Sequence, residues 1–482
     1  MIVSIIHDPN IKYPGGGDYF SPDHAWPEYR LGHLSGKPNP VYAAVRTCLA
    51  QAGLDKNNFG QPGWNPLGEY ISPGNRVFLL CNFVKEKEGF GSDAGFEAKC
   101  THASVIRAVI DYVLLALNGK GSIAFGNAPL QSCDWSAVTQ QTGAAQVQEF
   151  YSKHGNGAVN VNLVDLRQHI IRRSALGDVT TNFHADSGDQ CVEVDLNTDS
   201  LLDQLYSSTQ QPRFRVLDYD PRRTEGCHQR GHHRYILNRR IIESDVVISI
   251  PKLKTHEKVG ITCGIKGCVG AVAHKDCLAH HRYGPPKRGG DEYSDGLSAL
   301  AVFSALHDRV YSSNASAGRS ILHSVNYFSR KVIRRFTRAL SGSWPGNDTC
   351  WRMAVDLARI IKYTDKEGTL HSDPQRTHLL ITDGIIGGEG DGPLSPLPVS
   401  LGYLGFCDDI VAGDYGNALA MGFDPQHLPI IRESFGLAKY PLTDADPSLA
   451  EIRINGRTAS ISALRNGLGK KFLPPREWRQ TL

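Results

Sequence analysis

The stretch from Ile241 to Gly270, IIESDVVISIPKLKTHEKVGITCGIKGCVG, is the part of the chain from which the fold is most readily inferred. Its β-branched run at 246–250 predicts a short strand that is buried on both faces, as in a parallel sheet. Pro251 ends this strand because proline has no N–H for a central ladder. Open α/β sheets bind ligands at the carboxyl ends of their strands. We therefore expect a substrate site where the next polar side chains lie, at Lys252, Lys254, Thr255 and His256.

The second half of this stretch contains glycines at positions 260, 264, 267 and 270, and Lys266 lies among them. Glycine lets the backbone adopt conformations in which successive amides approach an anion. This pattern predicts an anion-binding loop. Within it, Lys266 and His256 are the candidates for catalysis.

Several of these motifs resemble those of the family called domain of unknown function 362. The resemblance rests on Pro-Lys-Leu-Lys-Thr-His at 251–256, Gly-Ile-Lys-Gly-Cys-Val-Gly at 264–270 and the acidic, glycine-rich segment at 383–393. It extends from the first predicted strand to about residue 435. At position 267 the family commonly has asparagine, where this chain has glycine. The resemblance implies an α/β fold and no particular activity, since the activity of the family is not established.

Weaker parts of the resemblance lie outside these three motifs. Asn82 lies at the end of a predicted strand, as in the family, and we place it among the substrate-binding residues. The alternative is that it caps a turn. The stretches 280–282 and 289–293 are similar to those of the longer members of the family. Some members carry an iron–sulfur module, which needs a dense run of cysteines. This chain has no such run, so we expect no iron–sulfur cluster.

The composition is that of a globular protein of 482 residues, with 40% hydrophobic residues and a formal net charge of +3. This charge does not favour a nucleic-acid partner, so any preference for anions must be local. The first residues lack the pattern of a secretory signal, and no apolar run is long enough to span a bilayer. We therefore expect a cytoplasmic protein, in which the 11 cysteines are reduced thiols.

Strand and helix patterns alternate along the chain, which predicts an α/β fold with a mostly parallel sheet flanked by helices. We expect two lobes around one cleft: an N-terminal lobe at 1–215 with an aromatic flap at 13–40, a C-terminal lobe at 216–440, and a tail at 441–482. Strands are predicted at 2–6, 76–83, 122–126, 159–166, 246–250 and 378–382, and helices at 41–52, 101–117, 137–151, 295–308 and 351–361.

A basic segment at 218–240 directly precedes the central strand. Its Arg222 and Arg223 could hold a phosphate or carboxylate, because the guanidinium group matches these anions. The alternative is a solvated loop. Lys275, beyond the lysine motif, is a further candidate for substrate binding.

His274, His280 and His281 follow the lysine motif and are numerous enough for a divalent metal site. Their spacing matches no standard metal motif. An array of imidazole and lysine side chains that binds an anion or transfers protons is the alternative.

Asp383 and Glu389 lie in the glycine-rich segment that follows the last predicted strand. As isolated carboxylates near the lysine motif they are candidates for proton transfer or for metal binding. The alternative is that they form buried ion pairs with Lys252, Lys254 or Lys266.

A basic amphipathic helix is predicted at 319–340, with five cations between 330 and 338. Its apolar stripe is formed by Ile321, Val325, Phe328, Val332, Phe336 and Leu340. Such a helix packs its stripe on the protein in most cases, and in others lies on a membrane surface.

Two functions follow from these features. The first is an enzyme that acts on a small anionic metabolite, phosphorylated, nucleotide-linked or carboxylate, in a Lys/His/Asp cleft. The second is a non-catalytic protein that binds a polyanion or a membrane surface through the same cleft and the basic helix. The two differ in geometry, because an enzyme gathers these side chains in one concave pocket. The sequence leaves the reaction, the metal and the oligomeric state open.

Overall fold

A computed structural model describes the chain at residues 2–87, 93–155, 157–173, 179–183, 190–208, 210–216, 219–312, 325–326, 328–329, 332–333, 337, 339–446 and 450–482. Most of the helix predicted at 319–340 lies outside these residues.

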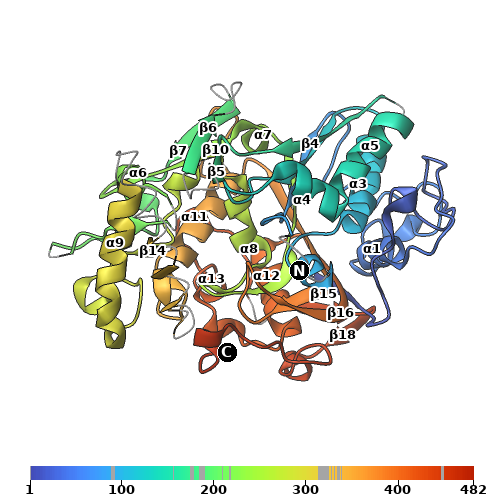
Figure 1. Cartoon of the computed structure of the whole chain (residues 1–482). Coiled ribbons are helices and arrows are strands. Elements are labelled where there is room, and N and C mark those ends of the chain that lie inside the picture. The colour runs from blue at the N-terminus through green and yellow to red at the C-terminus, as the bar shows by residue number, and fades with distance from the viewer. Residues whose placement is uncertain are drawn as a thin grey trace.

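One large sheet passes through the molecule (Figure 1), with the strand order β18-β17-β1-β16-β15-β11-β2-β3-β4. The four pairings from β15 to β4 are parallel, whereas β16 is antiparallel to both β15 and β1. The predicted α/β fold with a mostly parallel sheet is confirmed. The strands are β1 (Ile2–His7), β2 (Arg76–Cys81), β3 (Ser122–Asn127), β4 (Asn160–Asp165), β11 (Val246–Ile250), β15 (Thr377–Glu389), β16 (Leu397–Cys407), β17 (Glu451–Ile454) and β18 (Arg457–Ala459).

Strand β11 lies at the centre of the sheet, between β15 and β2, and all five of its residues are buried. Ile248 is opposite Leu79 of β2 and Leu379 of β15. The β-branched run therefore forms the doubly covered strand that its sequence predicts. Strand β12 (Lys252–His256) follows directly after Pro251, pairs with β15 and with β13 (Gly260–Ile261), and is also fully buried.

Alternate residues of the central strands belong to two separate hydrophobic cores, one on each face of the sheet. In β11, Val246 and Ile248 pack in the core that contains α1 (Pro40–Gln51), α3 (Ala103–Leu117) and α5 (Ala144–His154). Val247 packs in the other core. That core contains α8 (Cys263–Gly267), α11 (Cys350–Tyr363) and α12 (Ile410–Ala420). The two sets of helices lie apart in Figure 1, with α1, α3 and α5 together at one side.

Smaller elements surround the sheet. The helices are α2 (Asp93–Glu97), α4 (Trp135–Thr142), α6 (Pro221–Cys227), α7 (Arg239–Ile242), α9 (Ala301–Ser312) and α13 (Pro429–Arg432). The strands are β5 (His169–Arg173), β6 (Val179–Phe183), β7 (Cys191–Asp195), β8 (Phe214–Arg215), β9 (His228–Gln229), β10 (His232–Asn238) and β14 (His281–Arg282).

Three expectations from the sequence require correction. The helix predicted at 137–151 is divided into α4 and α5 at Gly143, whose φ of 82° interrupts the helical backbone. The strand predicted to end at 382 continues to Glu389. Cys227 and Cys277 form a disulfide with a Cα–Cα distance of 5.5 Å, so the expectation that all cysteines are reduced is wrong for this pair.

The division into two lobes and a tail stays a prediction. The central sheet takes strands from all three proposed segments, because β17 and β18 of the tail pair beside β1.

Candidate functional site

A cavity of about 250 Å³ lies where β2, β3 and β12 end. Residues at the ends of β2 and β3 form one part of its lining, at 82–84 and 127–130, and residues 256–258 at the end of β12 form another. The position is the one that open α/β sheets use for ligands. Further lining comes from Ser132, Ile171, Val216, Tyr219, Thr262, Lys266, Gly267, Val269, Gly270, Lys275, Leu278, His280, Tyr311, Pro393 and Leu394.

The polar part of this lining is basic. Lys258, Lys266 and Lys275 line the cavity, and all three are buried. Among the described residues that line it, Glu257 is the only acidic one. Because several cations share a desolvated space with one carboxylate, the cavity favours a negatively charged ligand.

Lys266 differs from the other lysines of the cavity. It lies in α8, its exposed fraction is 6%, and its ammonium group donates no hydrogen bond to any residue that the structure describes. Burial lowers the pKa of Lys266 below its ordinary value, because desolvation penalises the charged form.

The other two lysines donate to backbone carbonyl groups. Lys275 Nζ lies 2.9 Å from the carbonyl oxygen of Val269, and Lys258 Nζ donates to the carbonyl oxygen of Ser341. Burial, followed by the charge of Lys266, lowers the pKa of Lys275 to about 7. The charge of the cavity therefore depends on pH near neutrality.

Two neutral imidazoles line the cavity with opposite hydrogen-bonding roles. His256 Nδ1 accepts from the backbone N–H of Lys258 at 3.1 Å, so in the neutral ring the proton is on Nε2. His280 Nδ1 lies 3.2 Å from the carbonyl oxygen of Leu278, which can only accept, so Nε2 of His280 is the unprotonated nitrogen. Burial, and then the charge of Lys266, lowers the pKa of both rings well below the ordinary value.

A family model with the description "Domain of unknown function (DUF362)" matches residues 205–416. Over this segment, a little under half of its length, the chain is similar to the DUF362 family. No curated protein and no solved structure matches the chain. The matched segment supplies His256, Lys266 and His280, while Asn82 and Asn127 come from outside it. The cavity is therefore built from the DUF362 segment together with the strand ends that precede it in the chain.

The glycine-rich motif of the DUF362 segment is helical, and some of its amides have a partner within the protein. The backbone N–H groups of Gly264 and Ile265 donate to the carboxylate of Asp414, at 2.7 and 2.8 Å. A side chain at position 264 would approach Leu380 and Ile410 too closely. These amides thus bind an internal carboxylate instead of the anionic ligand that the sequence suggested. Asp414 lies within α12, whose N-cap is Asp409.

Of the two carboxylates proposed for catalysis, Asp383 lies in a buried network outside the cavity lining. It accepts from Lys252 Nζ and from the hydroxyl of Tyr13, both at 2.6 Å, and from the backbone N–H of His102 at 2.9 Å. This is the ion pair that the sequence offered as the alternative to catalysis. Tyr13 belongs to the predicted aromatic flap, so the network attaches the flap to β12 and β15.

Glu389 lies at the end of β15 and holds the C-terminal part of the chain. It accepts from Lys470 Nζ at 2.7 Å and from the backbone N–H of Leu473 at 2.9 Å. Like Asp383, it does not line the cavity.

The remaining proposed substrate-binding residues divide between the cavity and its surroundings. Asn82 and Lys275 line the cavity. Lys254 donates to Asn82 Oδ1 at 2.8 Å and to the carbonyl oxygen of Lys99, and burial lowers its pKa to about 7. Thr255 donates to the carbonyl oxygen of Gly390 at 2.8 Å, which ties β12 to the segment after β15.

The two arginines of the basic segment make ion pairs. Arg222 pairs with Asp220 at 2.7 Å, and about half of its side chain is exposed. Arg223 pairs with Asp276 at 3.3 Å, on the segment that carries Lys275. Neither arginine lines the cavity.

The three histidines proposed as metal ligands do not form one cluster. His280 lines the cavity, His274 Nδ1 lies 3.7 Å from Asp276, and His281 is buried in β14. Among the residues described, no group of three or more His, Cys, Asp or Glu side chains is arranged to hold a metal ion.

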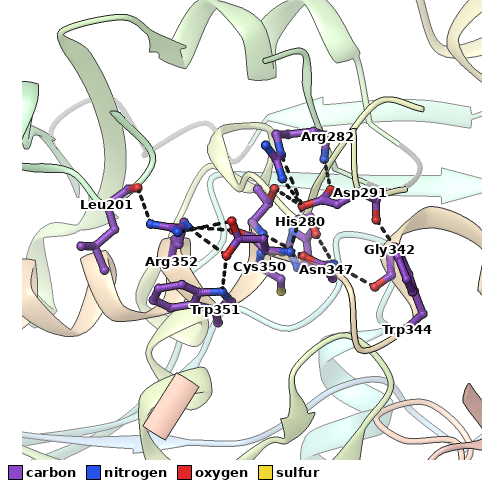
Figure 2. Close-up of polar contacts among 12 residues, drawn as sticks. Leu201, His280, Arg282, Asp291, Gly342, Trp344, Asn347, Cys350, Trp351 and Arg352 are labelled. Carbon is purple, nitrogen blue, oxygen red and sulfur yellow. Dashed lines mark hydrogen bonds and ion pairs between the residues drawn. The ribbon is translucent and has the colours of Figure 1, made fainter. Parts of the chain in front are cut away.

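A polar network holds the backbone of His280 in place (Figure 2). Asn347 Nδ2 donates to the carbonyl oxygens of His280, at 2.9 Å, and of Gly342, at 2.8 Å, while its Oδ1 accepts from the N–H of Cys350. Asp291 accepts from the N–H of Arg282 at 2.5 Å. The stretch 289–293, which contains Asp291, thus helps to hold the segment that carries His280.

Sequence reasoning did not select Lys258. The signal that could have identified it is its position two residues after His256, in the same loop as the lysine motif. Its cavity position depends on the short β12–β13 turn, which the sequence analysis did not predict.

Proposed function

We propose that the protein is an enzyme that acts on a small anionic metabolite bound in the cavity at the ends of β2, β3 and β12. The observation that supports this function best is the convergence of Lys258, Lys266 and Lys275 with two histidines, His256 and His280, in one concave space. Its lining, as far as the structure describes it, has a single carboxylate. Such convergence of cations and proton-transfer groups is characteristic of an active site.

Each group has a role in this proposal. The lysines neutralise the phosphate or carboxylate of the substrate. His256 donates a hydrogen bond from Nε2, and His280 Nε2 accepts a proton. The apolar lining, which includes Phe83, Leu130 and Leu278, contacts the uncharged part of the substrate. The location of the protein in the cell stays a prediction; no helix of the described segments is long and apolar enough to cross a membrane.

The test is isothermal titration calorimetry. The protein is titrated first with inorganic phosphate and then with phosphorylated sugars and nucleotides. We expect saturable binding that Lys258→Met and Lys275→Met each weaken by about tenfold or more, since a charged hydrogen bond contributes about 1.5–3 kcal/mol. The control is Lys153→Met, which removes an exposed lysine of α5 that pairs with Glu149. Equal binding by all variants would refute the proposed site.

The second candidate function, membrane-surface binding, is favoured by a different observation. Val325, Phe328 and Val332, from the predicted apolar stripe, are 50%, 64% and 57% exposed. Leu340, at the end of the stripe, is buried in a small core with Tyr293 and Leu300. Among the described residues of the stripe, Val325, Phe328 and Val332 are therefore the exposed ones. The sequence adds cations at 330, 331, 334, 335 and 338, which lie outside the described residues.

Apolar residues beside cations favour the surface of an anionic bilayer. Co-sedimentation with vesicles of phosphatidylserine and phosphatidylcholine tests this function. Binding should be lost in Phe328→Ser/Val332→Ser and in vesicles without phosphatidylserine. Unchanged sedimentation of this variant would exclude the stripe as the membrane contact.

A further inference from the structure

Lys266 is exceptional among the buried lysines of the protein. Five lysines of the described chain are buried: Lys252, Lys254, Lys258, Lys266 and Lys275. Four of them donate hydrogen bonds, to Asp383, to Asn82, to the carbonyl oxygen of Ser341 and to that of Val269, respectively. The amine of Lys266 has no acceptor among the described residues and lies at the cavity instead.

A buried amine without an acceptor is costly as an ammonium ion, because desolvation of a charge is not compensated. Its neutral form costs less and has a free electron pair on nitrogen. Burial lowers the pKa of Lys266, which increases the fraction of this nucleophilic form at neutral pH. Desolvation in an apolar pocket is a recognised way of activating a lysine as a nucleophile.

The reaction that suits such an amine is addition to a carbonyl carbon. The nitrogen forms a bond to carbon, and one proton moves from nitrogen to the carbonyl oxygen, which gives a carbinolamine. A second proton on that oxygen allows it to leave as water, while the nitrogen electron pair forms the C=N bond of an iminium ion. In the overall reaction, the amine, the carbonyl compound and one proton give the iminium ion and one water molecule. No oxidant or reductant is needed.

The two imidazoles of the cavity are suited to these proton transfers. His280 Nε2 is unprotonated and can accept the proton that leaves nitrogen. His256 carries its proton on Nε2 and can donate a hydrogen bond to the carbonyl oxygen. The charge of Lys266 affects the pKa of both rings, so all three groups lie close together.

We propose that Lys266 forms a Schiff base with an anionic aldehyde or ketone, whose phosphate or carboxylate is held by Lys258 and Lys275. This inference rests on the proposed function, since it needs an anion in the same cavity. It adds the covalent residue and the carbonyl class of the substrate. The net positive charge of the cavity and its volume of about 250 Å³ match a small carbonyl compound with one anionic group.

Reduction with sodium borohydride tests the proposal, because hydride converts an iminium into a stable secondary amine. The intact protein is incubated with pyruvate or with dihydroxyacetone phosphate, reduced, digested and mapped by mass spectrometry. We expect several-fold more adduct at Lys266 than at exposed Lys153, since the lowered pKa of Lys266 raises its free amine fraction. Inorganic phosphate in excess should suppress the adduct at Lys266 and leave that at Lys153 unchanged.

Two variants separate this inference from the proposed function. Lys266→Arg removes the nucleophilic amine and leaves a cation in the cavity, so it should bind phosphate and give no adduct at position 266. Lys153→Arg, the matched control at an exposed lysine outside the cavity, should retain the adduct at Lys266. Circular dichroism verifies that each variant is folded, and Lys266→Met replaces Lys266→Arg if the arginine does not fit.

Adducts spread evenly over exposed lysines, in protein that binds phosphate, would overturn the Schiff base and leave the anion site intact. Absence of phosphate binding in the unaltered protein would overturn the proposed function itself.

Discussion

Lys252 and Asp383 form an ion pair of 2.6 Å in which neither side chain is exposed to solvent. The pair joins β12 to β15 and, through the hydroxyl of Tyr13, fixes the N-terminal flap. Removal of one partner would leave a buried charge without compensation. We expect Asp383→Asn to lower the free energy of unfolding by about 3–5 kcal/mol, as is found when buried pairs are broken.

Urea denaturation measures this loss. The double replacement Lys252→Met/Asp383→Leu should recover much of the stability, because it removes both charges. The exposed pair of Lys153 and Glu149 is the control, and Glu149→Gln should change stability by less than about 1 kcal/mol. If Asp383→Asn is as stable as the unaltered protein, the pair has no structural role of this size.

Anion binding should weaken as pH rises through neutrality. The pKa of Lys275 is lowered to about 7 by burial, so its charge is present below this pH and is lost above it. We expect the Kd for sulfate to increase by up to about tenfold per pH unit above 7. Sulfate is the suitable probe because its own charge is constant across this range.

The same shift makes a prediction for stability. A lysine whose pKa is lower in the folded state than its ordinary 10.5 binds fewer protons when folded. Its contribution to the free energy of unfolding therefore rises between pH 7 and 10.5 and is constant below pH 7. In Lys275→Met both pH effects should be reduced, and a sulfate titration with unaltered pH dependence would assign them to another group.

Asp414 should be necessary for the cavity although it lies outside its lining. Its carboxylate accepts from the first amides of α8, the helix that carries Lys266. In Asp414→Ala these buried donors lose their acceptor, at a cost of about 1–3 kcal/mol each. We expect lower stability in thermal unfolding and weaker phosphate binding.

Asp409→Ala is the matched control, because Asp409 accepts from the amides of Val411 and Ala412 at the start of α12, at 2.9 Å each. This variant should lose stability and keep its affinity for phosphate. Equal effects of the two variants on affinity would show that α8 does not depend on Asp414 in particular.

The position of His280 should depend on Asn347, whose side chain holds its backbone carbonyl group (Figure 2). Asn347→Ala is expected to cost about 2–4 kcal/mol, since it leaves several buried backbone groups unpaired. It should also reduce the borohydride-trapped adduct at Lys266, because His280 would no longer be fixed for proton transfer.

Asn39 makes similar contacts at the start of α1, far along the chain from the cavity, with the carbonyl groups of Phe20 and Ser21 and the N–H of Tyr42. Asn39→Ala should therefore reduce stability without a change in trapping. A normal yield of adduct in folded Asn347→Ala would show that His280 needs no such support.

Local sequence patterns were sufficient to predict most of the fold. The run at 246–250 is too short and too β-branched for a helix, and it forms the central strand. The glycines from 384 to 388 were harder to interpret, because they suggest a loop. They lie in β15, where a Cβ at Gly384 would meet Leu253 and Tyr403. Such a close approach depends on contacts between distant segments, which a local pattern does not contain.

The site was predictable in its position and less so in its members. The rule for strand ends placed it after β11, at 252–256, a stretch that itself forms strand β12. Of the residues proposed, His256, Lys266, Lys275 and Asn82 line the cavity. Asp383 could not be assigned from sequence alone, because an acidic residue near lysines suits an ion pair and catalysis equally well. Only its register opposite Lys252 decides which contact it makes.

The order of strands in the central sheet bears on how the protein could be divided for experiment. The segment matched by the family model, 205–416, contains β11, β15 and β16 but neither β2 nor β1, their hydrogen-bonded neighbours. A fragment trimmed to this segment would leave β11 and β16 as unpaired edge strands and would expose apolar side chains on one face of the sheet. Exposed edges of this kind promote aggregation. Lys266 in such a fragment would also lack the opposite side of its cavity. The DUF362 segment is thus a unit of sequence similarity, whereas the unit of folding is a larger part of the chain.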